Sequence, residues 1–437
     1  MISFNKLRSS ANKLLAKRTW NNFYNCSVTN GSKAMSKSND MADLRSSVIE
    51  TVDRYAVELN NLSQQIWKNP ELGFKEYSAH TVLTDFLEKA GFKVEKHYKI
   101  ETAFKATFGD VDPSKPHIAV ICEYDALPGI GHACGHNLIA EVGIAAGLGI
   151  KDILEKSDTK LGQLTVLGTP AEEGGGGKII LMKHGAFKTF DVAMMAHPTP
   201  ATVTKIPILA RSKLMIKYIG KASHAAGFPW DGINALDAAV LCYQNISCLR
   251  QQFKPTWRVH GVITNGGVKP NIIPDQTELE YSVRAPKDSE LKILEAKIVK
   301  CVESAAQATG CKVEYEFGEH PYSAMLYNNT LCELYEKNAS SVGVEFSMDE
   351  SIKQSPLGST DMGNVSTVVP SIHPCFHMGT LAANHTTDFT TAAGSPAAQT
   401  FTLQQGKALA LTALDIYQST DLLQKIKQDF ITDTQNA

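Results

Sequence analysis

Three short, almost wholly apolar runs constrain the fold of this chain more than any other feature. The clearest is His117–Cys122, and Gln163–Leu167 and Asp191–Met195 repeat its pattern. Continuous apolar runs of this length indicate strands that are buried on both faces of a sheet. Helical patterns lie between them, over Asn137–Leu154 and Gly177–His184. Strands that alternate with helices predict an α/β domain with a mostly parallel sheet.

Chemically active side chains follow each of these three strands. Glu123 and Asp125 follow the first strand, Glu172 and Glu173 the second, and His197 the third. In open α/β sheets, ligands bind beside the carboxyl ends of the strands. We therefore expect these side chains to meet at one edge of the sheet and to form the functional site there.

The segment Gly131–His136 adds a thiol and an imidazole, those of Cys134 and His136, shortly after the first strand. Thiolate, imidazole and carboxylate groups together are the ligand set of zinc or a similar divalent metal. Taken singly, a cysteine is usually a small buried apolar residue and a histidine usually has a structural role. Their coincidence with three strand ends favours a metal site.

A late segment, Ala383–Thr386, contributes one more candidate ligand, His385. Five converging side chains are too many for one open tetrahedral site, but they suit two neighbouring metal ions that share a ligand. Glu172, next to a ligand glutamate but free of the metal, could take a proton from the attacking water as the general base. The expected metal ligands are Cys134, His136, Glu173, His197 and His385.

The sequence pattern changes near Ala210. Apolar and polar residues alternate over Ser212–Ile219, as in a half-exposed strand. The predicted order from there is strand, helix, strand, strand, helix, strand, which is that of a ferredoxin-like unit. One face or edge of its antiparallel sheet would stay open for a partner subunit. The later elements are expected at Ile233–Arg250, Trp257–Thr264, Glu278–Arg284, Ser289–Thr309 and Lys312–Phe317.

The α/β pattern resumes after this insertion, and a final helix over Ala392–Gln418 should pack back on the first domain. At 437 residues the chain is too long for one ordinary core. We expect a disordered leader over residues 1–42, a catalytic domain in two parts over 43–208 and 320–420, an inserted lid or dimerisation domain over 209–319, and a C-terminal tail over 421–437.

The leader contains lysine, arginine, serine and asparagine, but no acidic residue before Asp40. It resembles a mitochondrial transit peptide, and a merely disordered extension is an equal alternative. Nine cysteines without paired spacing indicate free thiols in a reducing compartment, so we expect the cytoplasm or the mitochondrial matrix rather than secretion. The formal net charge of −2 and the lack of a membrane-length apolar run argue against nucleic-acid and membrane partners.

Several motifs resemble those of a known family. HACGH, PAEEG and DALP occur with MAHP, GKASHAAGFPWDGINALDA, NIIPD, GSTD and NHT, spread over nearly all residues from about 45 to 420. The chain is similar to the metallopeptidase and amidohydrolase family that contains aminoacylase, several carboxypeptidases and dipeptidases, and the plant auxin-conjugate hydrolases. Within that family it most resembles the branch of the β-alanyl-lysine (Xaa-Arg) dipeptidases.

The resemblance implies a dimeric enzyme that hydrolyses small dipeptides with a basic C-terminal residue. It implies two divalent metal ions on the five ligands above, zinc with manganese as the alternative, and Glu172 as the base. Asp125 matches a residue that orients the site, and His224 one that reaches the other subunit's active site and stabilises the oxyanion. Glu123 stands where many relatives carry a metal-binding histidine, and we leave it out of the ligands. Asn271, Arg284 and Thr360 match substrate-holding positions.

Other interpretations stay open. The substrate could be an N-acyl or aminobenzoyl amino acid. A cysteine hydrolase would need Cys134 and His136 side by side, yet residues two apart on a glycine turn more naturally share a metal. A non-catalytic binding protein on the same fold would have lost its base or its ligands, and here all are present. We expect structural roles for His132, His373 and His377.

Overall fold

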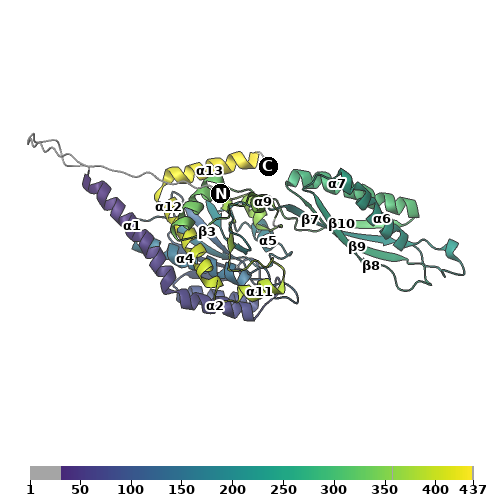
Figure 1. Cartoon of the computed structure of the whole chain (residues 1–437), viewed down its shortest axis with the longest axis horizontal. Helices are drawn as coiled ribbons and strands as arrows, with labels where there is room; N and C mark the ends of the chain where they lie inside the picture. Colours follow the sequence, from purple (N-terminus) through teal and green to yellow (C-terminus); the bar gives the residue numbers. More distant parts are fainter. Residues whose placement is uncertain (1–30, 357, 436–437) are drawn as a thin grey trace, which may run out of the picture. The chain divides into compact units, whose positions relative to one another are not determined.

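The computed structural model describes residues 31–356 and 358–435 (Figure 1). The first 30 residues of the predicted leader therefore lie outside the described part. Helix α1 spans Gly31–Arg54, so regular structure begins inside the segment expected to be disordered. No proline, and no glycine after Gly31, interrupts this stretch, which is why a helix can extend through it. The segment that ends at Asp43 forms a unit of its own, separate from the unit Leu44–Ala437.

The catalytic domain is built around a six-stranded sheet with the order β1-β2-β4-β3-β5-β11. Strands β4, β3, β5 and β11 run parallel, whereas β2 and β1 form an antiparallel edge. This confirms the predicted α/β class with a mostly parallel sheet. The strands are β1 (Lys93–Lys96), β2 (Phe104–Gly109), β3 (His117–Cys122), β4 (Gln163–Gly168), β5 (Val192–Met194) and β11 (Ser371–Ile372). A separate parallel pair, β6 (His197–Thr199) and β12 (Cys375–His377), follows β5 and β11 along the chain.

Small residues let two long helices approach closely beside this sheet. A Cβ atom on Gly406 of α12 would lie 2.5 Å from the Cβ of Ala145 on α4, so the contact requires glycine there. The helices of this domain are α2 (Ala56–Lys68), α3 (Tyr77–Lys89), α4 (His136–Lys156), α5 (Gly177–Lys183), α8 (Asn329–Ser341), α9 (Glu350–Gln354), α10 (Met362–Ser366), α11 (Thr387–Ala393), α12 (Ala398–Gln418) and α13 (Thr420–Gln435).

The C-terminal region differs from the expectation in two respects. The predicted final helix is divided into α11 and α12, because Gly394 and Pro396 interrupt it. The predicted tail is instead helical as α13 over Thr420–Gln435, and it buries Leu423 and Ile426. These two residues lie three apart on one helix face, so a short apolar stripe holds a mostly polar segment against the core.

The inserted domain is the predicted ferredoxin-like unit. Its sheet has the order β10-β7-β9-β8, every pair antiparallel, and helices α6 and α7 cover one face (Figure 1). Its core is a separate hydrophobic cluster. The elements are β7 (Ala210–Ile219), 3₁₀ turn η1 (Pro229–Asp231), α6 (Ala235–Leu249), 3₁₀ turn η2 (Arg250–Gln252), β8 (Arg258–Asn265), β9 (Gln276–Ala285), α7 (Asp288–Thr309) and β10 (Lys312–Phe317).

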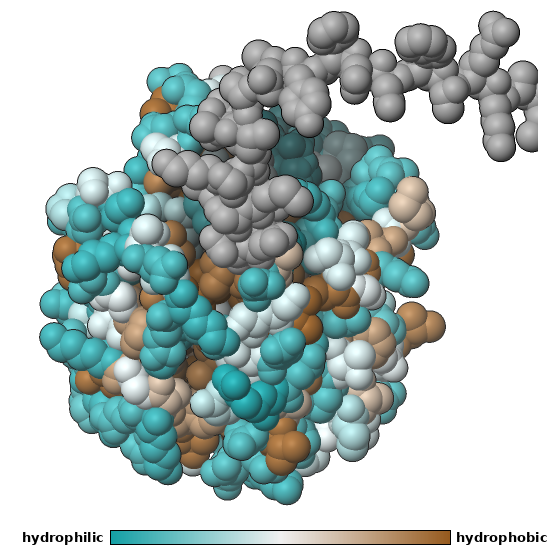
Figure 2. Space-filling view, turned by 90° about the vertical axis from the view of Figure 1, so that its left-hand side faces the viewer, coloured by the Kyte–Doolittle hydropathy of each residue, from teal (hydrophilic) through white to brown (hydrophobic). Residues whose placement is uncertain are grey.

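Large apolar side chains are exposed on the inserted domain. Trp230 is 75% exposed, Phe228 60% and Val262 59%, and the last of these lies on β8, an edge strand. Figure 2 shows another side of the molecule, and outside the grey atoms that side is predominantly hydrophilic. Over the described residues, no helix combines the length and the apolar character that crossing a bilayer requires.

Candidate metal centre

The ends of β3 and β4 deliver five of the predicted site residues to one place. After β3 the chain carries Asp125, then Cys134 in a tight turn, and then His136 as the first residue of α4. Gly135 makes this turn with a φ of 73°, and a Cβ atom there would lie 2.5 Å from Pro198. Only glycine meets both conditions, which explains the glycine between the thiol and the imidazole.

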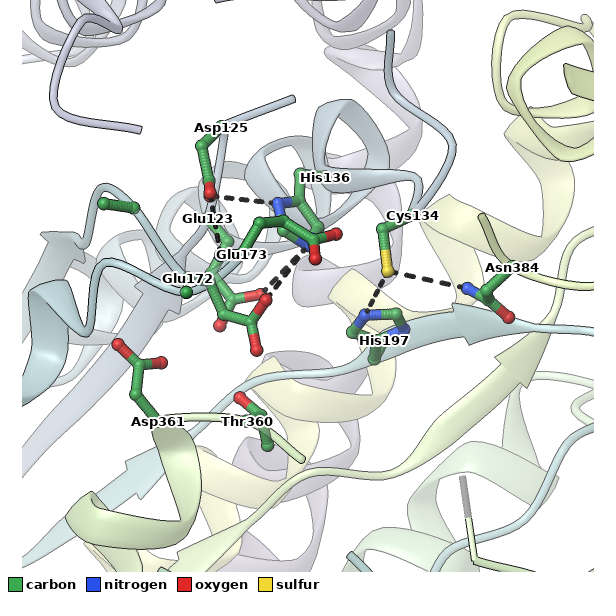
Figure 3. A network of polar contacts seen from close by, with 12 residues as sticks. Glu123, Asp125, Cys134, His136, Glu172, Glu173, His197, Thr360, Asp361 and Asn384 are labelled. Atoms are coloured by element: carbon green, nitrogen blue, oxygen red, sulfur yellow. Dashed lines mark hydrogen bonds and ion pairs between the residues drawn. The ribbon is translucent and has the colours of Figure 1, made fainter. Parts of the chain in front are cut away.

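The predicted ligands meet in three overlapping groups among the described residues, one of which joins His136 and Glu173 with the predicted base, Glu172. In the other two groups, donor atoms of Cys134, His136 and His197 lie within 4.8 Å of one another, and so do those of Cys134, Glu173 and His385. The Sγ atom of Cys134 belongs to both groups, and Figure 3 shows it beside His197. Two neighbouring cations that share one sulfur ligand would match this arrangement.

Hydrogen bonds orient the two buried imidazoles. His136 donates from Nδ1 to Oδ1 of Asp125 at 3.1 Å, and His197 donates from Nδ1 to the carbonyl oxygen of Pro198 at 2.9 Å. Each bond fixes the ring so that Nε2 keeps its lone pair for the centre, the usual arrangement around a metal-binding histidine. Asn384 contacts Cys134, with its Nδ2 atom 3.8 Å from Sγ (Figure 3).

The polar atoms that point into the centre fit a bound cation. Nε2 of His136 is buried without a hydrogen-bond partner among the described residues, and the buried Oε1 of Glu173 lies 3.4 Å from Nε2 of His385, another predicted ligand. Buried polar atoms are rarely left without a partner, because that costs free energy. Sulfur, imidazole and carboxylate donors are those that zinc and similar ions bind, so the residues present fit the group that the sequence predicts.

Backbone strain occurs at two points of the site. Ala171 and His385 have φ values of 59° and 66°, a region that residues other than glycine rarely adopt. Ala171 precedes Glu172, and its N–H donates to Oε1 of Glu76 at 2.9 Å. The N–H of His385 donates to the carbonyl oxygen of Ala133 at 2.8 Å. Strain of this kind tends to occur at functional sites, and here it places a glutamate and a histidine.

Glu172 belongs to the group with His136 and Glu173, and its Oε2 lies 3.9 Å from Nε2 of His136. Burial, together with the negative charges of Glu123 and Glu173, raises the pKa of Glu172 well above its usual value. The Tyr322 hydroxyl donates to the Glu172 carbonyl oxygen at 2.6 Å and accepts from the N–H of Gly174 at 3.1 Å. These bonds hold the turn that presents the carboxylate, so proton uptake by Glu172 is chemically reasonable.

Lys178, Glu123 and Asp361 form a fully buried ion triad close to this turn. Nζ of Lys178 lies 2.5 Å from Oε1 of Glu123 and 2.6 Å from Oδ1 of Asp361. Burial alone would lower the pKa of Lys178, but the two carboxylates raise it. Sequence reasoning missed Lys178, and it assigned no role to Asp361 of the GSTD motif, because the fold alone brings these two residues together with Glu123.

The site opens into a cavity of about 490 Å³ to which the inserted domain contributes arginines. Arg284 on β9 is paired across the sheet with Arg211 on β7 and with Arg258 on β8, and all three line the cavity. Side chains directly opposite one another lie on the same sheet face, and like charges in that position repel. Thr360 also lines the cavity, so two of the three predicted substrate-holding residues are there.

Two predicted site residues lie apart from this cavity. His224 and Asn271 are exposed neighbours on the inserted domain, where the N–H of Ala225 donates to the carbonyl oxygen of Asn271 at 3.1 Å. Nδ1 of His224 accepts from the N–H of Gly227 at 3.0 Å. Neither residue lines the cavity of its own chain.

The three histidines expected to be structural differ from one another. Nε2 of His132 lies 3.2 Å from the carbonyl oxygen of Ile66, and Nδ1 of His377 lies 2.9 Å from that of Pro200. His373 instead lines the cavity. Burial raises the pKa of the Cys134 thiol, with a further contribution from Glu173.

Comparisons with known proteins show which proteins this chain resembles. Residues 212–309 match the model of the peptidase dimerisation domain. The chain is 50% identical over 404 residues to the Xaa-Arg dipeptidase of Homo sapiens, and the match covers 90% of this chain and 92% of that protein. It is 29% identical to one component of the p-aminobenzoyl-glutamate hydrolase of Escherichia coli, over 86% of this chain and 92% of that protein.

Solved structures share the fold at low sequence identity. An aminohydrolase from Staphylococcus aureus superposes with a TM-score of 0.69 at 19% identity, covering 85% of this chain and 99% of that one. A dinuclear metal binding peptidase of the M20 family from Bacillus subtilis gives 0.62 at 20% identity, covering 83% and 99%. Because the chain is 50% identical to the Xaa-Arg dipeptidase over 90% of its length, it belongs to the Xaa-Arg dipeptidase branch of the M20 metallopeptidase family.

Proposed function

We propose that this protein is a metal-dependent hydrolase of dipeptides whose C-terminal residue is basic: lysine, ornithine or arginine. The convergence of Cys134, His136, Glu173, His197 and His385 beside Glu172 is the single observation that carries the hydrolytic chemistry. The substrate class rests on the 50% identity to the Xaa-Arg dipeptidase.

The five ligands would hold two divalent cations, one on each of the two groups that share Cys134. We propose zinc, because sulfur and imidazole donors favour it, with manganese as the alternative that carboxylates also suit. When bound, such a pair supplies Lewis acidity that makes water a better nucleophile and polarises the amide carbonyl.

The protein's own groups would then handle the proton. The buried carboxylate of Glu172 takes the proton that the attacking water loses and delivers it to the leaving amine nitrogen. Asp125 keeps His136 in place by its bond to Nδ1, and its other oxygen accepts the backbone N–H of Glu173 at 2.9 Å. One carboxylate thus fixes a histidine from α4 and a glutamate from the turn after β4 in a common geometry.

The arginines on the inserted domain would hold the substrate's terminal carboxylate. Arg284, Arg211 and Arg258 lie side by side in register, and Nε of Arg284 is buried without a hydrogen-bond partner among the described residues. A guanidinium group binds a carboxylate with two parallel hydrogen bonds. An added anion would also relieve the repulsion within the row.

One observation favours a second candidate function, hydrolysis of an N-acyl or aminobenzoyl amino acid. The described lining of the cavity includes three arginines, but its only carboxylates are Glu172 and Glu173. An acidic side chain on the substrate would suit that charge, and the relative at 29% identity is a p-aminobenzoyl-glutamate hydrolase.

We further propose a homodimer in which His224 and Asn271 serve the site of the partner subunit. The match to a peptidase dimerisation domain and the exposed apolar side chains of β8 and η1 support this arrangement. Both residues are exposed and lie apart from their own chain's cavity, so a second chain could meet them. For the compartment we propose the cytoplasm or the mitochondrial matrix, on the composition of the leader.

The test is a substrate screen on purified, metal-analysed protein. β-Alanyl-lysine, N-acetyl-lysine and p-aminobenzoyl-glutamate should give the highest kcat/KM for the dipeptide, and a chelator should abolish the activity. A preference for p-aminobenzoyl-glutamate would replace the first function with the second. Cys134→Ser should lower the content of both metals, whereas Cys332→Ser, which changes a buried cysteine on α8 outside the ligand groups, should keep it.

A further inference from the structure

His373 stands at a fourth strand end of the catalytic sheet. It follows β11, which pairs in parallel with β5 so that Ile372 lies opposite Met194. The chain after β5 supplies His197, and the two imidazole rings lie with their centroids 5.4 Å apart and their planes tilted by 32°. His373 therefore reaches the same edge of the sheet as the predicted metal ligands, although it belongs to none of the ligand groups.

The ring of His373 is buried but has no polar partner. The residue is 1% exposed, and within the described chain no other residue supplies a hydrogen-bond partner to Nδ1 or Nε2. His132 and His377, by contrast, each contact a backbone carbonyl oxygen. Because an unsatisfied buried imidazole costs free energy, its retention in a cavity wall indicates a partner that arrives with a ligand.

The two sides of the cavity differ in charge. The inserted domain contributes Arg211, Arg258 and Arg284, which attract a carboxylate and repel an amine. His373 belongs to the catalytic domain, and a neutral imidazole offers one lone pair to an N–H donor. A dipeptide that extends from the arginines across Glu172 would place its amino-terminal end on the catalytic-domain side.

We propose that His373 is a substrate-binding residue that accepts a hydrogen bond from the primary amine of the dipeptide's amino-terminal residue. This inference rests on the proposed dipeptidase function and extends it to the recognition of that amine. An acyl group without an amine would leave the ring unsatisfied, so His373 would favour dipeptides over N-acyl amino acids.

Two ligands that differ solely in this amine provide the test. Calorimetry in the slow Glu172→Gln background would measure the Kd of β-alanyl-lysine and of N-propionyl-lysine, which replaces the amino group by hydrogen. His373→Leu and His373→Phe, which carry no acceptor, should each weaken β-alanyl-lysine by about tenfold or more, the effect of losing a hydrogen bond to a charged group, and should change N-propionyl-lysine by less than about threefold. His377→Leu, whose native ring contacts Pro200 outside the cavity, is the matched control and should change neither.

Each other outcome overturns the inference in a recognisable way. Equal weakening of both ligands, or a fall in metal content, would show that His373 acts on the structure or on the metals. Unchanged affinity for β-alanyl-lysine would show that the ring does not contact the amine. If the Glu172→Gln protein binds N-propionyl-lysine but not β-alanyl-lysine, the proposed dipeptidase function itself fails, independently of any change at His373.

Discussion

Asp125 and His136 are joined by a hydrogen bond of 3.1 Å between Oδ1 and Nδ1, and both side chains are buried. Removing the charge of the carboxylate should loosen the ring without removing a ligand. We expect Asp125→Asn to weaken metal binding about 10–100-fold, measured by competition with a chelator of known affinity. Asp110→Asn, which changes an exposed carboxylate paired with Lys160, is the control and should leave the affinity unchanged. Full affinity in the Asp125 variant would contradict the orienting role.

Glu172 and Glu173 are adjacent, but removing the charge of one should lower the rate and removing that of the other should lower the metal content. Glu172→Gln should lower kcat by roughly 10²–10⁴-fold, the usual contribution of a general base, while both metals stay bound. Glu173→Gln should lose metal, because Glu173 belongs to the group with Cys134 and His385. Metal analysis and steady-state kinetics on the same preparations separate the two effects. If Glu172→Gln retained its rate, another group would have to move the proton.

Lys178 should be essential for stability rather than for binding. Lys178→Met leaves the carboxylates of Glu123 and Asp361 buried without a counter-charge, which should cost on the order of 3–5 kcal/mol. Thermal unfolding would show this as a lower Tm. Adding Glu123→Gln and Asp361→Asn removes the uncompensated charges and should restore part of the loss. A single Lys178 variant with the Tm of the wild type would contradict the triad's role.

Glu141 should make stability depend on pH. Burial raises its pKa to about 7 from 4.5, although Gln399 donates a hydrogen bond to it at 3.1 Å. Because folding raises the pKa of this carboxyl group, its contribution to the free energy of unfolding is fully present below about pH 4.5 and is lost as the pH rises through about 7. Glu141→Gln should avoid this loss, so above neutral pH the variant should be more stable than the wild type by at most roughly 3 kcal/mol. Urea unfolding at pH 5 and pH 8 should show a larger gain at pH 8, and an equal effect at both would refute the assignment.

The edge strand of the inserted domain should control assembly. Val262 on β8 is 59% exposed, and Val262→Asp should convert a dimer to monomers in light scattering after size exclusion. The kcat should fall with dissociation if His224 serves the partner subunit. Val111→Asp changes a residue that is 80% exposed on the catalytic domain, and this control should stay dimeric. A fully active monomer would exclude the role in trans.

Several of the predicted site residues could be placed from the sequence because they follow strands that an apolar run reveals, whereas His385, His224, Asn271, Arg284 and Thr360 came from a late segment or from the family resemblance. Continuous apolar runs located β3, β4 and β5, and Asp125, Glu172 and His197 lie just beyond them. His373 follows β11, which has two residues and gives no periodic signal. Its place could be known only once the pairing with β5 had formed.

The arginine row shows a second limit of sequence reasoning. Arg284 was predicted from the family resemblance, but Arg211 and Arg258 join it through the registers of β7 and β8 against β9. A shift of one residue in either pairing would turn those side chains to the other face. The fold class, in contrast, depends on the order of the elements and was predicted correctly, although α1, β11 and the C-terminal helices differ from the prediction.

The shared position of Cys134 makes the two groups that contain it depend on the redox state of one atom. Oxidation of that sulfur to a sulfinic acid would take the soft donor from both groups together, and this step is not reversed by ordinary cellular thiols. Exposure to peroxide should therefore inactivate the two positions as a unit, whereas bound metal would protect the sulfur from attack.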